Sequence, residues 1–256
     1  MLVWLVNQHG LSASIFNLDP IVVALQSAAL TMLAAVWSRL IVGATHLSFV
    51  SAYMHAQLLK YLPTGVANIA ALIVDTSIIS TNKVSITVRK FAVSVTLMAI
   101  GAATLSLAAV NWVLFPTTLF VASLLYSLTH KHWITGSRSQ HRRSTIVNLW
   151  TTAAAVLLVS LSFALYARGQ NVLLAVPIGR IVAVFAVSWF AGLVAVVAPA
   201  GIGVREAGLT LLLPDLLSFA EAIEVSIGHR INQSVAEIVC VILVAGFRLR
   251  RFARRS

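Results

Sequence analysis

Charged residues are scarce in this chain. They make up 10% of its 256 residues, whereas a typical soluble domain carries about 25%. The mean hydropathy is correspondingly high, at +0.95, and several segments reach the roughly 20 apolar residues that a spanning helix needs. The scarcity of charge therefore excludes an ordinary soluble domain. It predicts an all-α fold, a polytopic bundle of helices integral to a membrane.

Cysteines and the usual catalytic motifs are also few. The one cysteine, Cys240, lies in an apolar segment and excludes an internal disulfide. The sequence has no phosphate loop of the Walker type, so ATP hydrolysis by this chain is not expected. A basic stretch holds three histidines whose loose spacing, without a nearby acid, favours a solvated loop over a metal site: His130, His132 and His141. We expect no metal, no cofactor and no catalytic residue.

Acidic residues are few as well: seven stand against 18 lysines and arginines, which gives a net charge of +11. The positions of the basic residues argue against a nucleic-acid partner, because they fall in the loops 82–90 and 130–144 between apolar segments and in an arginine-rich C-terminal tail. Short basic stretches beside spanning helices mark the cytoplasmic side. We therefore expect a protein of the cell (cytoplasmic or inner) membrane with a cytoplasmic C-terminus.

The apolar segments organise the whole chain, 1–256, as a single transmembrane domain. The turn Arg168-Gly169-Gln170-Asn171 is expected on the outer side. Proline and glycine break two of the predicted helices, and a re-entrant course for these two stays open. We predict spans at about 20–42, 47–81 (broken), 91–109, 112–128, 145–167, 172–197, 203–213 (short) and 221–247.

The two breaks share the pattern Pro-x-Gly-aliphatic, in Pro63-Thr64-Gly65-Val66 and Pro199-Ala200-Gly201-Ile202. Paired interruptions of this kind in the two halves of a transporter point to its binding site. The alternative is a pair of ordinary turns. Pro63, Gly65 and Pro199 are thus predicted helix breaks. In a membrane, such breaks survive only where protein or a water-filled cavity covers them.

Two opposite charges, Arg205 and Glu206, follow the second break. A helix that starts after Gly203 presents free N–H groups, and these groups together with a guanidinium suit a phosphate. Arg205, Gly201, Gly203 and Arg230 are therefore candidates for binding a lipid phosphate.

The last predicted helix offers partners for both charges. Arg230, Gln233 and Glu237 fall on one face of it. We infer crossed contacts, of Glu206 with Arg230 and of Arg205 with Glu237, in a charge network that includes Gln233. The alternative is a buried structural ion pair without a ligand.

The stretch Pro199-Ala200-Gly201-Ile202-Gly203-Val204-Arg205-Glu206 resembles the signature of the lysylphosphatidylglycerol synthase transmembrane family, which are flippase-like membrane proteins. Lys60-Tyr61-Leu62-Pro63 with Gly65 is similar to a second motif of that family, and Lys60 joins the phosphate-binding candidates. His229-Arg230-Ile231 followed by Glu237 is similar to the family's late helix. The resemblance covers roughly residues 30–248, without the aminoacyltransferase domain.

This resemblance implies translocation of an anionic or polyprenyl-linked membrane lipid, with a phosphate held between the broken helices. The alternative is an accessory membrane domain that presents a lipid substrate to a separate glycosyl- or aminoacyl-transferase. A membrane-embedded enzyme ranks third, because Glu206 and Glu237 could act as bases but no nucleophile or metal set accompanies them. The oligomeric state stays open.

Overall fold

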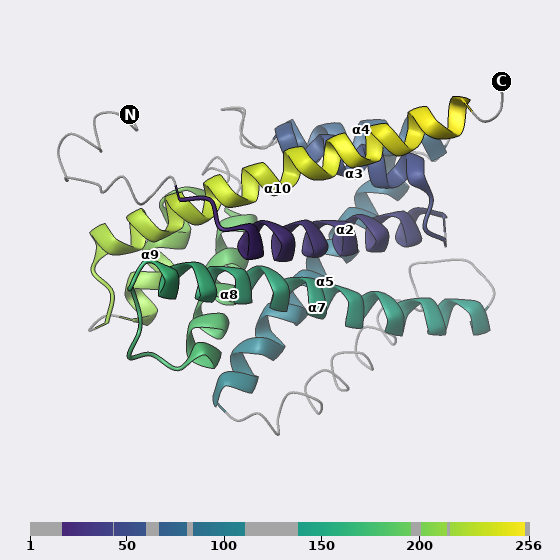
Figure 1. Ribbon diagram of the computed structural model, residues 1–256. Coiled ribbons are helices and arrows are strands. Elements are labelled where there is room, and N and C mark those ends of the chain that lie inside the picture. Colours follow the sequence, from purple (N-terminus) through teal and green to yellow (C-terminus); the bar gives the residue numbers. More distant parts are fainter. Residues whose placement is uncertain are drawn as a thin grey trace.

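The computed structural model describes residues 17–42, 44–59, 67–80, 84–110, 138–195, 201–213 and 216–253. In these residues all regular elements are helices, which confirms the all-α prediction for this part of the chain (Figure 1). The helices are α2 (Pro20–Val42), α3 (Leu47–Leu58), α4 (Ala67–Ser80), α5 (Val84–Val110), α7 (Arg138–Gly169), α8 (Ile178–Val194), α9 (Val204–Leu212) and α10 (Phe219–Ala253).

Four segments of these helices are long and apolar enough to cross a membrane. They are Pro20–Val42, Ile86–Ala103, Ile146–Gly169 and Phe219–Phe247. Ile69–Ser80 and Ile178–Leu193 are shorter apolar helices. The predicted span 112–128 and the first break, with Lys60, Pro63 and Gly65, lie outside the described residues, as does Pro199.

The basic loops were predicted too long. Helix α5 already begins at Val84 and α7 at Arg138, so 84–90 and 138–144 are helical. Lysine and arginine are good helix formers, and a helix can continue in polar sequence beyond its apolar span. Lys90 also has a structural task here, because its Nζ donates a hydrogen bond of 2.8 Å to the carbonyl of Ile41 at the end of α2.

The predicted span 172–197 was also too long at its start, because α8 begins only at Ile178. Asn171 and Leu173 both have a φ of 60°, which interrupts the helix after Gly169. The Nη2 atom of Arg168 donates a 2.7 Å hydrogen bond to the carbonyl of Val176 and closes this turn. At the other end of the chain, α10 continues past the predicted 247 to Ala253.

Hydrogen bonds that involve side chains fix the directions of three central helices. Gln26 of α2 bonds Ser162 and Arg39 bonds Thr151, so α2 and α7 run antiparallel. Asp19 bonds Asn232, and Ser27 accepts a contact from Cys240, so α2 and α10 run parallel. Figure 1 shows the result: the end of α2, the start of α7 and the end of α10 lie at one end of the bundle.

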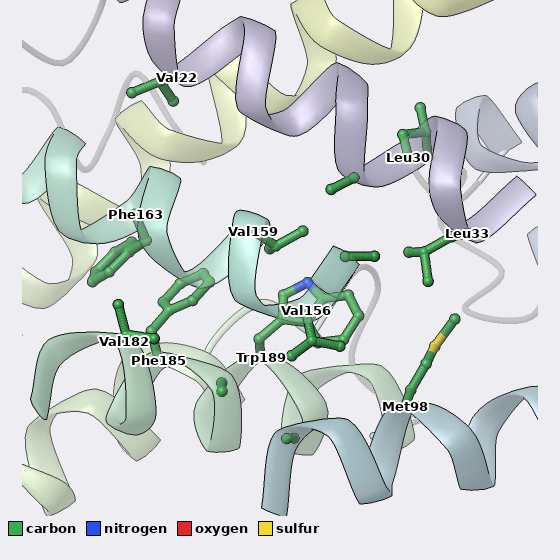
Figure 2. Close-up of a cluster of buried hydrophobic side chains, with 14 of the residues drawn as sticks. Val22, Leu30, Leu33, Met98, Val156, Val159, Phe163, Val182, Phe185 and Trp189 are labelled. Atoms are coloured by element: carbon green, nitrogen blue, oxygen red, sulfur yellow. The ribbon is translucent and has the colours of Figure 1, made fainter. Parts of the chain in front are cut away.

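The apolar core lies between α2, α7 and α8 (Figure 2). Phe163 and Phe185 stack there with ring centroids 4.1 Å apart and an interplanar angle of 13°. Alanines such as Ala29 and Ala155 are fully buried, and small residues of this kind let helix backbones approach closely. Trp189 of α8 extends the core toward Leu33 of α2 and Met98 of α5, where a cavity begins.

Candidate functional site

The start of α9 is built on two glycines and lies directly against α8. Gly201 has a φ of 70° and Gly203 a φ of 87°, a region that side-chain-bearing residues rarely adopt. A Cβ on Gly201 would lie 2.6 Å from the carbonyl oxygen of Gly192. The second break therefore requires glycine both for its backbone conformation and for its contact with α8.

Glu206 ties this start of α9 to α10. Its Oε2 accepts a 2.7 Å hydrogen bond from the backbone N–H of Gly203, and its Oε1 lies 3.1 Å from Nη2 of Arg230. The same Nη2 donates to the carbonyl of Gly201 at 3.2 Å. The contact between Glu206 and Arg230 that the sequence predicted is thereby confirmed.

This network changes the interpretation of three predicted phosphate ligands. Gly201, Gly203 and Arg230 do come together, but around the carboxylate of Glu206, which already interacts with the amino end of α9. A second anion at this end would face that carboxylate at close range. In this structure the three residues hold α9 in place, and their binding of a phosphate stays a prediction.

Arg205, the neighbour of Glu206, lies on the wall of a cavity inside the bundle. The cavity has a volume of about 280 Å³, and Gly201, Gln233 and Glu237 also line it. Arg205 is 8% exposed and Glu237 is 1% exposed, so the cavity wall carries two buried charges of opposite sign. The predicted direct contact of Arg205 with Glu237 stays a prediction, although Gln233 does donate a 3.0 Å hydrogen bond to Glu237.

Space for the Arg205 side chain is created by Gly192 of α8. A Cβ at position 192 would lie 2.7 Å from Cγ of Arg205 and 3.1 Å from its Nε. No such overlap arises at Gly179, the other glycine of α8, where nothing lies within 4 Å of a built Cβ. Gly192 thus lets the guanidinium lie along α8 and reach the cavity.

The remaining cavity wall combines rings with a few amide and hydroxyl groups. Trp37, Tyr53, Phe91 and Trp189 contribute the rings. The uncharged polar residues on the wall are Gln26, Gln57 and Ser94, besides Gln233. Sequence reasoning missed these residues. The available signal was the presence of glutamine within otherwise apolar segments, since polar residues inside a membrane span are rare and mark functional positions.

A buried cluster of polar side chains adjoins the cavity at Gln26. The Nε2 atom of Gln26 donates to Oγ of Ser162 at 2.8 Å and lies 2.7 Å from Nε2 of His229. Because an amide N–H points at it, Nε2 of His229 acts as an acceptor. Phe163 and Phe185 meet the imidazole edge to face, each at 5.3 Å. The cluster joins α2, α7 and α10 beside the cavity.

Within the described residues, no group of three or more histidines, cysteines or acids could hold a metal ion. The side chains of the three predicted loop histidines lie outside the described part.

Comparisons with known proteins add no further assignment. No family model matches the chain, no curated protein matches it, and no solved structure matches it. The family resemblance of its motifs therefore stays a prediction.

Gly192 gives a direct test of the packing around Arg205. We expect Gly192→Ala to destabilise the protein by about 1–3 kcal/mol, because the new methyl group overlaps the arginine side chain. Gly179→Ala is the matched control and should be neutral or slightly stabilising. Thermal unfolding of the detergent-solubilised protein measures both. Equal midpoints for the two variants would show that Arg205 does not lie along Gly192.

The ion pair of Glu206 and Arg230 is testable with a double-mutant cycle. Glu206→Gln leaves the half-buried Arg230 without its carboxylate partner, and we expect a loss of about 1–3 kcal/mol. The double variant Glu206→Gln with Arg230→Gln should be more stable than the sum of the single effects predicts. Glu221→Gln, at an exposed acid of α10, is the control. Simple additivity in thermal unfolding would contradict a direct pair.

Proposed function

We propose that this chain is a polytopic membrane protein that binds a phosphate-bearing lipid in the cavity beside Arg205 and translocates it between the leaflets. The observation that carries the proposal is the pair of buried charges, Arg205 and Glu237, on one cavity wall among helices of spanning length. An ionisable residue inside a membrane is costly and by default indicates function. A guanidinium is also the side chain best suited to grip a phosphate.

The outer surface supports a membrane location. Ile78 of α4 and Ile242 and Phe247 of α10 are 70%, 63% and 62% exposed. Large apolar side chains exposed to this extent would be unfavourable in water but suit hydrocarbon. The motif resemblance to flippase-like proteins supports translocation as the activity.

The charge distribution supports a cytoplasmic C-terminus in the cell membrane. Lys90 bonds the end of α2, Arg39 lies near that end, and Arg250 lies at the end of α10. The start of α7, with Arg138, Arg142 and Arg143, lies at the same end of the bundle. By the positive-inside rule this end faces the cytoplasm.

A second candidate function is an accessory membrane domain that presents a lipid to a separate glycosyl- or aminoacyl-transferase. The observation in its favour is the network of Glu206, Gly203 and Arg230, which fixes α9 on α10. A rigid site of this kind suits holding a lipid as well as moving one. Purified protein that binds lipid but moves none would favour this candidate.

Arg205 is the residue on which translocation should depend. We expect Arg205→Ala to slow lipid movement at least about tenfold, because a charge-assisted hydrogen bond to the phosphate is lost. Arg180→Ala is the matched control, since Arg180 lies exposed at the start of α8. Movement of acyl-labelled phospholipids in proteoliposomes, read by quenching of the outer leaflet, gives the rate.

A companion variant separates the effect of Arg205→Ala on folding from its effect on lipid movement. Arg205→Ala with Glu237→Gln removes both charges of the cavity wall and should restore the solubilised yield seen by size-exclusion chromatography. Lipid movement should remain lost, because the phosphate ligand is still missing. A double variant that moves lipid at the wild-type rate would show that Arg205 is purely structural.

Topology is testable by cysteine labelling in a Cys240→Ser background. Leu174, in the turn before α8, and Arg250, near the end of α10, are both exposed. We expect an impermeant thiol reagent added to intact cells to label Leu174→Cys and not Arg250→Cys. Permeabilised cells, in which both positions should react, are the control. The opposite pattern would invert the topology.

A further inference from the structure

We propose that the cavity recognises a zwitterionic phospholipid headgroup, with its phosphate at Arg205 and its ammonium group at Glu237 and the neighbouring rings. This inference rests on the proposed function and narrows its lipid to one chemical class. Three features of the described cavity wall carry it: the balance of charge, the aromatic residues and the size.

The charges on the cavity wall balance. Arg205 contributes one positive charge from α9, and Glu237 contributes one negative charge from α10. An exclusively anionic headgroup would bind Arg205, but the carboxylate of Glu237 on the same wall would repel it. A headgroup with a phosphate and an ammonium offers a group of opposite charge to each of the two side chains. Charge complementarity of this kind selects one headgroup over another.

The aromatic residues indicate the nature of the cationic group. Trp37, Tyr53, Phe91 and Trp189 all line the cavity. Trp37 is fully buried, whereas Trp189 and the half-buried Phe91 keep accessible ring surface. Alkylated ammonium groups are recognised by the faces of such rings, and tryptophan binds them best. The Trp37 N–H already bonds Oγ1 of Thr76 at 3.1 Å, and Trp37 meets Phe91 edge to face at 6.3 Å. These contacts fix the Trp37 ring and use its polar atom.

The size of the cavity favours a compact headgroup. Its volume of about 280 Å³ lies just below the roughly 300–1,000 Å³ that ligand pockets occupy. A phosphate and a small ammonium need less of this space than a sugar carried on a diphosphate does. Leu30, Leu33 and Met98 continue the wall and offer an apolar surface to the glycerol ester region. The cavity thus suits a phospholipid better than a polyprenyl-linked sugar.

The test compares headgroups in one assay with the full chain. Proteoliposomes receive acyl-labelled phosphatidylcholine, phosphatidylethanolamine or phosphatidylglycerol in trace amounts. We expect the two zwitterionic lipids to move about tenfold faster than phosphatidylglycerol. Glu237→Gln should remove this preference, whereas the matched variant Glu221→Gln should retain it. Phe91→Leu, which removes a ring but keeps an apolar side chain, should slow phosphatidylcholine more than phosphatidylethanolamine.

A binding measurement separates this inference from the proposed function. In an uncharged detergent, lysophosphatidylcholine should raise the thermal unfolding midpoint more than lysophosphatidylglycerol does. Selective protection without movement of any lipid would support the headgroup assignment and contradict translocation. Equal movement of all three phospholipids would overturn the headgroup assignment and leave translocation standing. Free phosphocholine that protects as well as the lysolipid would overturn the lipid as the source of the headgroup.

Discussion

The close contact of Gly192 with Gly201 is the constraint on which the site depends. These glycines bring the end of α8 against the start of α9, with no room for a side chain between them. Because Gly192 lacks a side chain, Arg205 can lie along α8 and reach the cavity. Because Gly201 and Gly203 adopt positive φ angles, α9 can begin at Val204 with Glu206 in its first turn. The position of both charges thus follows from glycines in two neighbouring segments.

Arg205 and Glu206 are neighbours in sequence but serve different tasks. Successive residues of a helix point in different directions, so Glu206 faces α10 and Arg205 faces the cavity. The Glu206 carboxylate interacts with both the helix start and Arg230. This internal pairing holds α9 on α10 and gives the buried carboxylate of Glu206 a half-buried cationic partner. Arg205 and Glu237 are the charged residues that the described cavity wall presents to a ligand.

The polar cluster beside the cavity also holds helices in place, as the pair of Glu206 and Arg230 does. Gln26, Ser162 and His229 join three helices through hydrogen bonds of 2.7–3.0 Å. Inside a hydrocarbon environment an unsatisfied polar group costs several kcal/mol, so such a cluster specifies how the helices pack. Gln26 belongs to both the cluster and the cavity wall. The packing of α2, α7 and α10 therefore also positions one polar wall of the site.

The sequence by itself determined the helical class of the described part, the presence of helices long and apolar enough to cross a membrane, and the pairing of Glu206 with Arg230. The length of an apolar segment predicts a helix long enough to span a membrane. Opposite charges within apolar segments are expected to pair, because an unpaired charge there is costly. The tertiary structure alone decided the helix ends in polar sequence, the aromatic wall and the cluster around His229. The periodicity of apolar residues describes each helix separately and does not show which helices are neighbours. The rings of the cavity wall come from four different helices: Trp37, Tyr53, Phe91 and Trp189. They meet only because the packing of small residues sets which helix faces lie together.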